Sequence, residues 1–150
     1  MTLQPLSPAL HIVGIELRTS NLMAFETIPA HWQRFSQENA LARIEGRLSD
    51  EVFAVYTNFE FAGRDNTGLY SLIVGAAVAP QADPPPGMVR AVVPVSQRAV
   101  FTVAPGRVDQ VGAAWQGIWQ RQDLRKTFIA DYERYGAGGA IEISVGVAEP

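Results

Sequence analysis

Apolar and polar positions along the chain divide it into short strands. Residues 141–147 (IEISVGV) alternate apolar with polar or small side chains, which is typical of a strand with one buried face. Residues 69–78 are apolar almost throughout, which indicates a strand in the centre of a sheet. β-branched and aromatic residues predict five further strands, at 11–18, 52–59, 88–95, 98–103 and 128–135.

Two helices are predicted between these strands. Thr27 can cap a helix and Pro29 is tolerated in its first turn, so we expect a helix from Thr27 that carries Trp32 and Phe35. The second helix shows one apolar stripe with spacings of three and four residues, formed by Val108, Val111, Trp115, Ile118 and Trp119. Two segments lack such a pattern: residues 1–9 predict a loose lead-in, and residues 80–87 (PQADPPPG) predict an irregular joint.

The elements occur twice in a similar order. Residues 51–79 and 129–148 both contain an aromatic and acidic strand, a glycine turn and an apolar strand, and a helical segment with tryptophan precedes each. We therefore predict a single α+β domain with a largely antiparallel sheet and two main helices. Its two β-α-β-β units are placed at residues 10–79 and 88–148. Two similar units in one small domain predict a pseudo-symmetric body with a ligand cleft between them.

Composition and charge narrow the function classes. The 150-residue chain has a formal net charge of −3, which argues against a nucleic-acid-binding surface, since such a surface needs clustered positive charge. The absence of cysteine excludes disulfides, zinc–thiolate sites and cysteine nucleophiles. No apolar run reaches the roughly 18 residues that span a bilayer, and the N-terminus does not resemble a signal peptide. We expect a cytoplasmic protein without direct DNA or membrane binding and without a cofactor.

Glu133 is the first candidate for ligand contact. On an extended strand it shares a face with Asp131 and Tyr135, opposite Ala130 and Tyr132. Desolvating an unpaired carboxylate in an aromatic cleft is costly, so a cationic ligand would relieve that cost. Aromatic faces add cation–π attraction. The alternative is that Glu133 pairs with an arginine at the protein surface.

Aromatic residues and glycines supply the other candidates. Trp115 and Trp119 lie four residues apart on one helix face, and core packing is their alternative role. Tyr56 and Phe59 point to opposite faces of a regular strand, so they cannot both line the cleft if the strand is regular. Gly75 lies inside a strand, where glycine often marks a close approach of a ligand or backbone. The predicted ligand-binding residues are Glu133, Asp131, Tyr135, Trp115, Trp119, Tyr56, Phe59, Tyr70, Phe101, Gly75 and Gly146, and no catalytic or metal-binding residue is predicted.

Short segments spread along the chain carry a family resemblance. They include Gly14-Ile15-Glu16, Ile28-Pro29, Trp32-Gln33-Arg34-Phe35, Pro86-Gly87-Met88, Trp115-Gln116-Gly117-Ile118-Trp119 and Asp131-Tyr132-Glu133-Arg134-Tyr135. In this order they resemble the GyrI-like small-molecule-binding domain, also called the AraC-type effector-binding domain. The resemblance covers roughly residues 11–147. It implies two β-α-β-β units with a cleft that binds amphipathic, often cationic, compounds, and an acidic ligand contact at Glu133.

The resemblance also implies several possible roles. Many members are fused to a helix-turn-helix module for transcription regulation, and this chain resembles a stand-alone member. We expect it to bind an amphipathic cation for regulation or sequestration. Two alternatives stay open: hydrolysis of an electrophilic natural product, with Glu133 as general base and Tyr135 or Tyr56 as acid, and inhibition of a protein partner such as gyrase. The sequence does not specify the oligomeric state.

Overall fold

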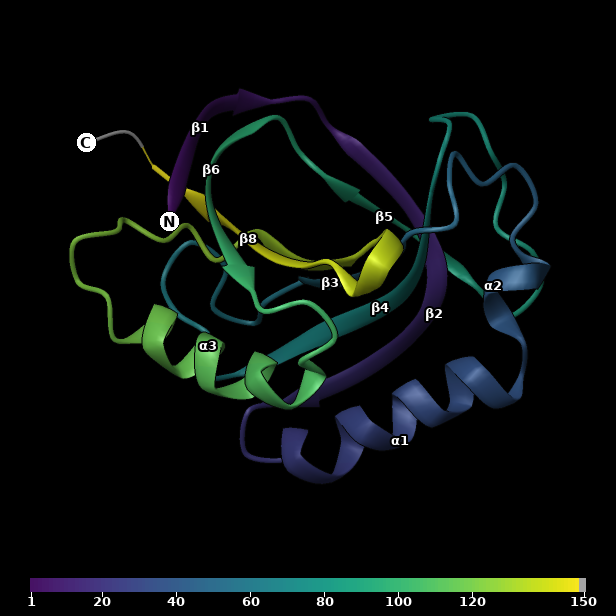
Figure 1. The fold of residues 1–150 in the computed structure, drawn as a ribbon, viewed down its shortest axis with the longest axis horizontal. Coiled ribbons are helices and arrows are strands. Elements are labelled where there is room, and N and C mark those ends of the chain that lie inside the picture. Colours follow the sequence, from purple (N-terminus) through teal and green to yellow (C-terminus); the bar gives the residue numbers. More distant parts are fainter. Residues whose placement is uncertain (149–150) are drawn as a thin grey trace.

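An eight-stranded antiparallel sheet forms the body of the protein (Figure 1). The computed structural model describes residues 1–148. The strand order is β1-β6-β8-β7-β3-β4-β2-β5, and the predicted α+β class is confirmed. The strands are β1 (Thr2–Ser7), β2 (Leu10–Ser20), β3 (Val52–Thr57), β4 (Leu69–Val78), β5 (Val89–Val93), β6 (Ser96–Val103), β7 (Ala130–Tyr135) and β8 (Ile141–Val147).

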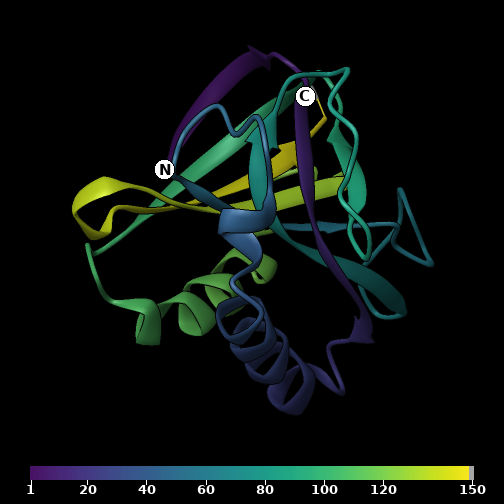
Figure 2. The same cartoon turned by 90° about the vertical axis from the view of Figure 1, so that its right-hand side faces the viewer.

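Two longer helices cover one face of the sheet. These are α1 (Ala24–Gln37) and α3 (Val111–Trp119), and Figure 2 shows them side by side below the strands. A short helix, α2 (Ala40–Arg43), follows α1, and single 3₁₀ turns lie at Val108–Gln110 and Ala137–Gly139. Within residues 1–148, no helix combines the length and apolar content that crossing a membrane requires.

The sheet is built from two halves with the same arrangement. The first half places its strands in the order β3-β4-β2, and the second half repeats this as β7-β8-β6. The halves meet at the β3–β7 pair, where Ala54 lies opposite Glu133 and Tyr56 lies opposite Asp131. The predicted pair of units is therefore visible in the topology, and α1 and α3 are their equivalent helices.

The N-terminal residues form strand β1, which differs from the expected loose lead-in. β1 pairs with β6 of the second half, with Thr2 opposite Val100. In the equivalent way β5, which leads into β6, pairs with β2 of the first half. Pro8 and Pro94 stand between the two strands in each case, where a missing backbone donor breaks no ladder bond. Each half therefore supplies its leading strand to the other half, an exchange that local propensity does not reveal.

The start of α1 also differs from the prediction. The helix begins at Ala24, and Pro29 lies inside it rather than in its first turn. The Thr27 hydroxyl donates to the Met23 carbonyl at 3.0 Å. Because this bond runs back along the helix, Thr27 does not cap the helix N-terminus.

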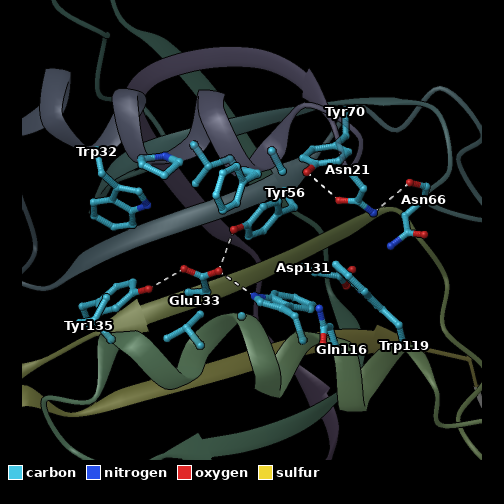
Figure 3. A pocket seen from close by; sticks show the side chains of 18 of the residues that line it. Asn21, Trp32, Tyr56, Asn66, Tyr70, Gln116, Trp119, Asp131, Glu133 and Tyr135 are labelled. Atoms are coloured by element: carbon cyan, nitrogen blue, oxygen red, sulfur yellow. Dashed lines mark hydrogen bonds between the residues drawn. The ribbon is translucent and has the colours of Figure 1, made fainter.

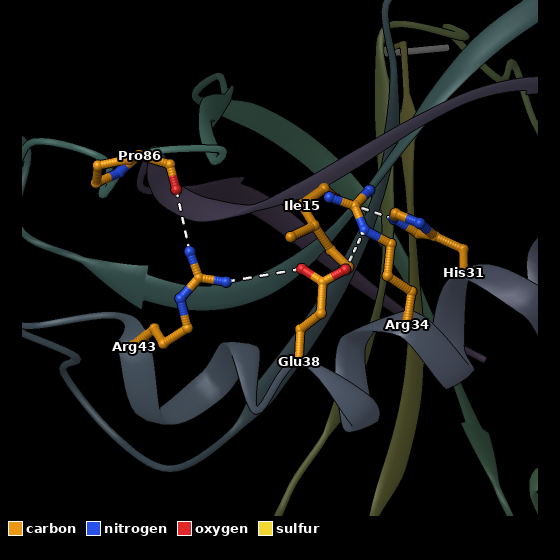
Figure 4. A network of polar contacts seen from close by, with 6 residues as sticks. All are labelled: Ile15, His31, Arg34, Glu38, Arg43 and Pro86. Atoms are coloured by element: carbon orange, nitrogen blue, oxygen red, sulfur yellow. Dashed lines mark hydrogen bonds and ion pairs between the residues drawn. The ribbon is translucent and has the colours of Figure 1, made fainter.

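Polar contacts hold α1 against the first half of the sheet (Figure 4). His31 is buried, and its Nε2 donates to the Ile15 carbonyl of β2 at 3.0 Å. Burial lowers the pKa of His31 and favours its neutral form. Further along α1, Glu38 accepts from Arg34 at 2.7 Å and pairs with Arg43 of α2 at 3.7 Å. The His31 bond therefore joins α1 to the sheet, whereas the Glu38 pairs join the end of α1 to α2.

Apolar side chains from the two helices form separate clusters on the sheet. Phe35 of α1 packs with Val13, Ile15 and Val74, whereas Ile118 of α3 belongs to a second cluster with β6 and β8. The side chains of Tyr56 and Tyr135 contact both clusters. These two tyrosines therefore stand at the junction of the halves, between the two helices.

Two facing glycines allow β2 and β4 to come very close. Gly14 of β2 lies directly opposite Gly75 of β4. A Cβ atom on Gly75 would stand 1.8 Å from the Val13 carbonyl oxygen, and one on Gly14 would stand 2.2 Å from the Val74 carbonyl oxygen. The sequence analysis explained a glycine at position 75 by the close approach of either a ligand or a backbone, and the structure shows that it is the backbone of β2.

Candidate ligand-binding site

A cavity of about 780 Å³ lies between α1 and α3, over the β3–β7 pair (Figure 3). This volume is within the range of small-molecule sites. All three tryptophans of the chain, Trp32, Trp115 and Trp119, line it. The lining also includes Asn21, Ala24, Phe25, Ile28, Pro29, Gln33, Tyr56, Phe59, Asn66, Tyr70, Val108, Val111, Gly112, Gln116, Asp131, Glu133 and Tyr135. The cavity is thus an aromatic space with few polar groups, at the predicted place between the halves.

Glu133 lies in this cavity and accepts three hydrogen bonds. The Tyr56 hydroxyl and Trp115 Nε1 both donate to its Oε2 at 2.7 Å. The Tyr135 hydroxyl donates to Oε1 at 2.6 Å. The residue is only 2% exposed, although it is charged at neutral pH in its usual state. These donors hold the carboxylate in one orientation on the floor of the cavity.

No cationic side chain neutralises Glu133. Among residues 1–148, the ion pairs do not include it, which contradicts the alternative of a surface arginine partner. Arg134, its neighbour in sequence, binds Glu51 at 2.7 Å instead. Burial raises the pKa of Glu133, while the hydrogen bonds from Tyr135, Tyr56 and Trp115 oppose that rise. The carboxyl group of Glu133 is therefore buried, held by three neutral donors, and without a cationic side chain beside it in residues 1–148.

The tyrosines around Glu133 remain protonated donors. Burial is the main cause that raises the pKa of Tyr56 and of Tyr135, and the nearby Glu133 charge adds to it. Burial also raises the pKa of Tyr70 to about 12. Tyr70 turns its hydroxyl to the Asn21 side chain at 2.8 Å, as Figure 3 shows. The negative charge in this cluster is thus confined to the carboxylate.

Asp131 contributes a second carboxylate to the lining. It is 6% exposed, and its Oδ1 accepts a hydrogen bond from the Gly146 backbone N–H at 2.8 Å. Burial raises the pKa of Asp131 to about 6, and the Gly146 bond and the charges of Arg98 and Lys126 limit the rise. Part of the Asp131 population is therefore protonated in mildly acidic solution.

The raised pKa of Asp131 predicts a pH-dependent contribution to stability. The folded pKa of about 6 exceeds the usual value of 3.8, so this contribution is present below pH 3.8 and is lost as pH rises through about 6. Relative to Asp131→Asn, the wild type should lose about 1–3 kcal/mol of unfolding free energy between pH 4 and pH 7. Urea denaturation of both proteins across this range measures the difference. A pH-independent difference would contradict the assignment.

Eight of the predicted site residues meet at the cavity, and three do not. Glu133, Asp131, Tyr135, Trp115, Trp119, Tyr56, Phe59 and Tyr70 line it. Phe101 packs on the α3 side of β6, under Arg121. Gly75 faces the β2 backbone, and a Cβ on Gly146 would stand 2.8 Å from Thr127 Oγ1. Gly146 reaches the site only indirectly, through its N–H bond to Asp131.

Tyr56 and Phe59 both line the cavity, which the strand pattern did not predict. β3 ends at Thr57, and Asn58 has a positive φ of 51°. The chain therefore leaves the strand before Phe59, so the alternation of faces no longer applies. The condition of a regular strand is therefore not met, and both side chains line the cavity.

Sequence reasoning did not identify the wall that α1 provides. Phe25, Ile28 and Trp32 of α1 all reach the cavity. Their spacing of three and four residues is an apolar helix face, which sequence reading assigns to the core. The one sequence signal that α1 lines the cavity was Trp32, because it occupies the place in the first unit that the tryptophans of α3 occupy in the second.

The fold has close structural relatives at low sequence identity. An integron cassette protein from the mobile metagenome of Vibrio cholerae superposes with a TM-score of 0.73 at 22% identity, over 97% of each chain. SAV2435, solved with bound tetraphenylphosphonium, gives 0.76 at 20% identity over 98% of this chain and 93% of that one. A putative transcription regulation protein from Staphylococcus aureus MU50 gives 0.75 at 19% identity, over 99% and 97%.

Sequence comparison identifies the family. No curated protein matches the chain significantly. The profile of the GyrI-like small molecule binding domain matches residues 6–138, which is most of the chain. This match agrees with the two-unit sheet and with the cavity between its helices. The chain therefore belongs to the family of GyrI-like small-molecule-binding domains.

Proposed function

We propose that this protein is an effector-binding domain that takes an amphipathic organic cation into the cavity between α1 and α3. Its role would be regulatory or sequestering, in the cytoplasm. The observation that carries the proposal is the Glu133 carboxylate, which is buried, hydrogen-bonded by three neutral donors and without a cationic partner. The expected contacts are Glu133 for charge and the aromatic walls for the apolar body.

The energetic argument rests on the cost of the buried charge. Burial makes ionised Glu133 unfavourable, so a cation that enters the cavity removes a penalty that folding has already incurred. The rings of Trp32, Trp115 and Trp119 can each add about 0.5–2 kcal/mol of cation–π attraction. A neutral ligand of the same shape would receive the apolar contacts without the charge term.

The structural neighbour SAV2435 supports this choice of ligand class. It was solved with tetraphenylphosphonium, which is a bulky aromatic cation without hydrogen-bond donors. The neighbour shares the fold at 20% identity, so the ligand class is a proposal for this chain. The regulatory role rests in the same way on the Staphylococcus aureus neighbour described as a transcription regulation protein.

Tryptophan fluorescence tests the proposal directly, because all three tryptophans line the cavity. Titration with tetraphenylphosphonium should give a saturable change in emission. The neutral triphenylphosphine oxide should bind at least about tenfold more weakly than methyltriphenylphosphonium, a cation with the same three phenyl rings, and this ratio corresponds to about 1.4 kcal/mol. Equal affinities for both compounds would contradict a charge-matched site.

A second candidate function is hydrolysis in the same cavity. The Tyr135 hydroxyl lies 2.6 Å and the Tyr56 hydroxyl 2.7 Å from the Glu133 carboxylate, so a general base and a general acid stand together. Incubation with electrophilic natural products, followed by mass spectrometry, decides between the two functions. Product that forms with wild type but not with Glu133→Gln would support the hydrolase.

A further inference from the structure

We propose that Asp131 is a second ligand contact, which makes the cavity select protonated amines with N–H donors over quaternary cations of the same shape. This inference rests on the proposed function, since it specifies which cations the same cavity prefers. The feature that suggests it is one free oxygen on a carboxylate that is otherwise buried in the lining.

The free oxygen is Oδ2 of Asp131. Its companion Oδ1 accepts the Gly146 N–H, and no hydrogen bond from residues 1–148 reaches Oδ2. In that part of the chain, the unpaired side-chain atoms that are sealed from solvent are His11 Nδ1, Arg47 Nε and Gln97 Oε1. Oδ2 is not among them, so it is not sealed from solvent, and Asp131 is one of the residues that line the cavity. Oδ2 is an acceptor without a partner, at a residue only 6% exposed.

Glu133 offers a ligand donor less acceptor capacity than Asp131 does. Its Oε2 already accepts two hydrogen bonds and its Oε1 accepts one. A carboxylate has about four acceptor positions, so one remains on Oε1 of Glu133, whereas both positions of Asp131 Oδ2 are free. Glu133 therefore attracts any cation through its charge, with or without N–H groups. A donor on the ligand gains its hydrogen bond at Asp131.

The two carboxylates are close enough to act on one cationic group. Asp131 and Glu133 lie two residues apart on β7 and face the same cavity, so their Cα atoms are separated by about 6.8 Å. An ammonium group placed between them feels the charge of Glu133 and donates an N–H to Oδ2 of Asp131. A trimethylammonium group at that position presents only C–H groups to Oδ2.

The nearby cationic side chains do not occupy Asp131. Arg98 and Lys126 are the positive groups that influence its pKa. Arg98 directs Nε to Ser144 Oγ and Nη2 to the Ser144 carbonyl, both at 2.9 Å. Lys126 donates to the carbonyls of Ile118 and Arg121. Neither forms an ion pair with Asp131 in the described residues, so Oδ2 stays available to a ligand.

A matched pair of cations tests the inference. The probes are 4-phenylbenzylammonium and its N,N,N-trimethyl analogue, titrated by tryptophan fluorescence at about pH 8, where Asp131 is ionised. The proteins are wild type, Asp131→Asn and Glu133→Gln. Asparagine can still accept the Gly146 N–H through Oδ1, while the acceptor that faces the cavity and the negative charge are both lost. Because the two probes carry the same charge, the lost charge weakens both, and the ratio of their affinities reports the hydrogen bond.

The measured quantity is the ratio of the quaternary Kd to the primary ammonium Kd. We expect this ratio to be at least about tenfold larger in wild type than in Asp131→Asn. Glu133→Gln should weaken both cations by similar factors and keep the ratio. An unchanged ratio in Asp131→Asn would overturn the role of Asp131 while the cation site itself stands. Failure of both cations to bind wild type would overturn the proposed function, and this inference with it.

A methylation series on wild type gives a test that needs no variant. The N-methyl and N,N-dimethyl ammonium probes each retain at least one N–H donor. Their affinities should remain close to that of the primary ammonium, and the loss should come at the third methyl group. A gradual change across the series, without a step at the quaternary probe, would contradict a hydrogen bond to Asp131.

Discussion

Glu133→Gln should raise the Kd of tetraphenylphosphonium at least about 30-fold, equivalent to about 2 kcal/mol, and leave that of triphenylphosphine oxide nearly unchanged. Glutamine keeps the size of the side chain, and its single oxygen can accept from Tyr56 and Trp115 while its NH2 group donates to the Tyr135 hydroxyl oxygen. It removes the charge that burial makes costly and that a cation compensates. Fluorescence titration or calorimetry with both compounds measures the effect.

The matched control for this variant is Glu45→Gln. Glu45 is an exposed carboxylate outside the cavity lining, and its replacement changes the net charge of the protein by the same amount. It should leave both affinities unchanged. Equal losses for the cation in Glu45→Gln and Glu133→Gln would show a long-range charge effect instead of a contact. Because burial raises the pKa of Glu133, Glu133→Gln should also be no less stable than wild type at neutral pH.

Gly75→Ala should lower the unfolding free energy by about 3 kcal/mol or more, or prevent folding. The new Cβ would stand 1.8 Å from the Val13 carbonyl oxygen, a backbone atom that cannot turn away as a side chain does. Relief requires β2 and β4 to separate in the middle of their ladder, where Gly14 faces Gly75. Urea denaturation measures the loss if the variant is soluble.

Gly117→Ala is the matched control for this substitution. Gly117 lies inside α3, and a Cβ there would meet no atom within 4 Å. Alanine is the better helix former by about 0.5–1 kcal/mol, so this variant should be more stable than wild type. A wild-type stability for Gly75→Ala would show that β2 and β4 do not approach as closely as described.

The strands and their pairing into two units could be predicted because each is a local pattern. The alternation at residues 141–147 and the apolar run at 69–78 correspond to β8 and β4. β1 could not be predicted in the same way, since Pro5 and Pro8 lack backbone donors and disfavour a strand in this segment. Its stability comes from pairing with β6, almost a hundred residues later in the chain, where Thr2 lies opposite Val100.

The site was predictable where strand alternation applies. Asp131, Glu133 and Tyr135 share a face by that rule alone, and all three line the cavity. The rule does not apply to Phe59, because the chain leaves the extended conformation at Asn58. It could not identify Trp32 as a cavity residue either, because a helix face that lines a cavity and one that packs in the core have the same residue spacing. The hydrogen bonds from Tyr56 and Trp115 to Glu133 join three separate elements, so no local pattern contains them.

The exchanged leading strands have a consequence for how the chain reaches its fold. During synthesis β1 emerges well before its partner β6, which follows only after the entire first half. The same delay applies to β3, because its neighbour from the second half, β7, is near the C-terminus. Pairings of such long sequence separation slow folding, because loop-closure entropy must be overcome before they form. Until then the nascent first half exposes the unpaired edge of β3 and the whole of β1. Pro5 in β1 has no backbone N–H, so β1 offers fewer hydrogen bonds to another strand that pairs with it wrongly.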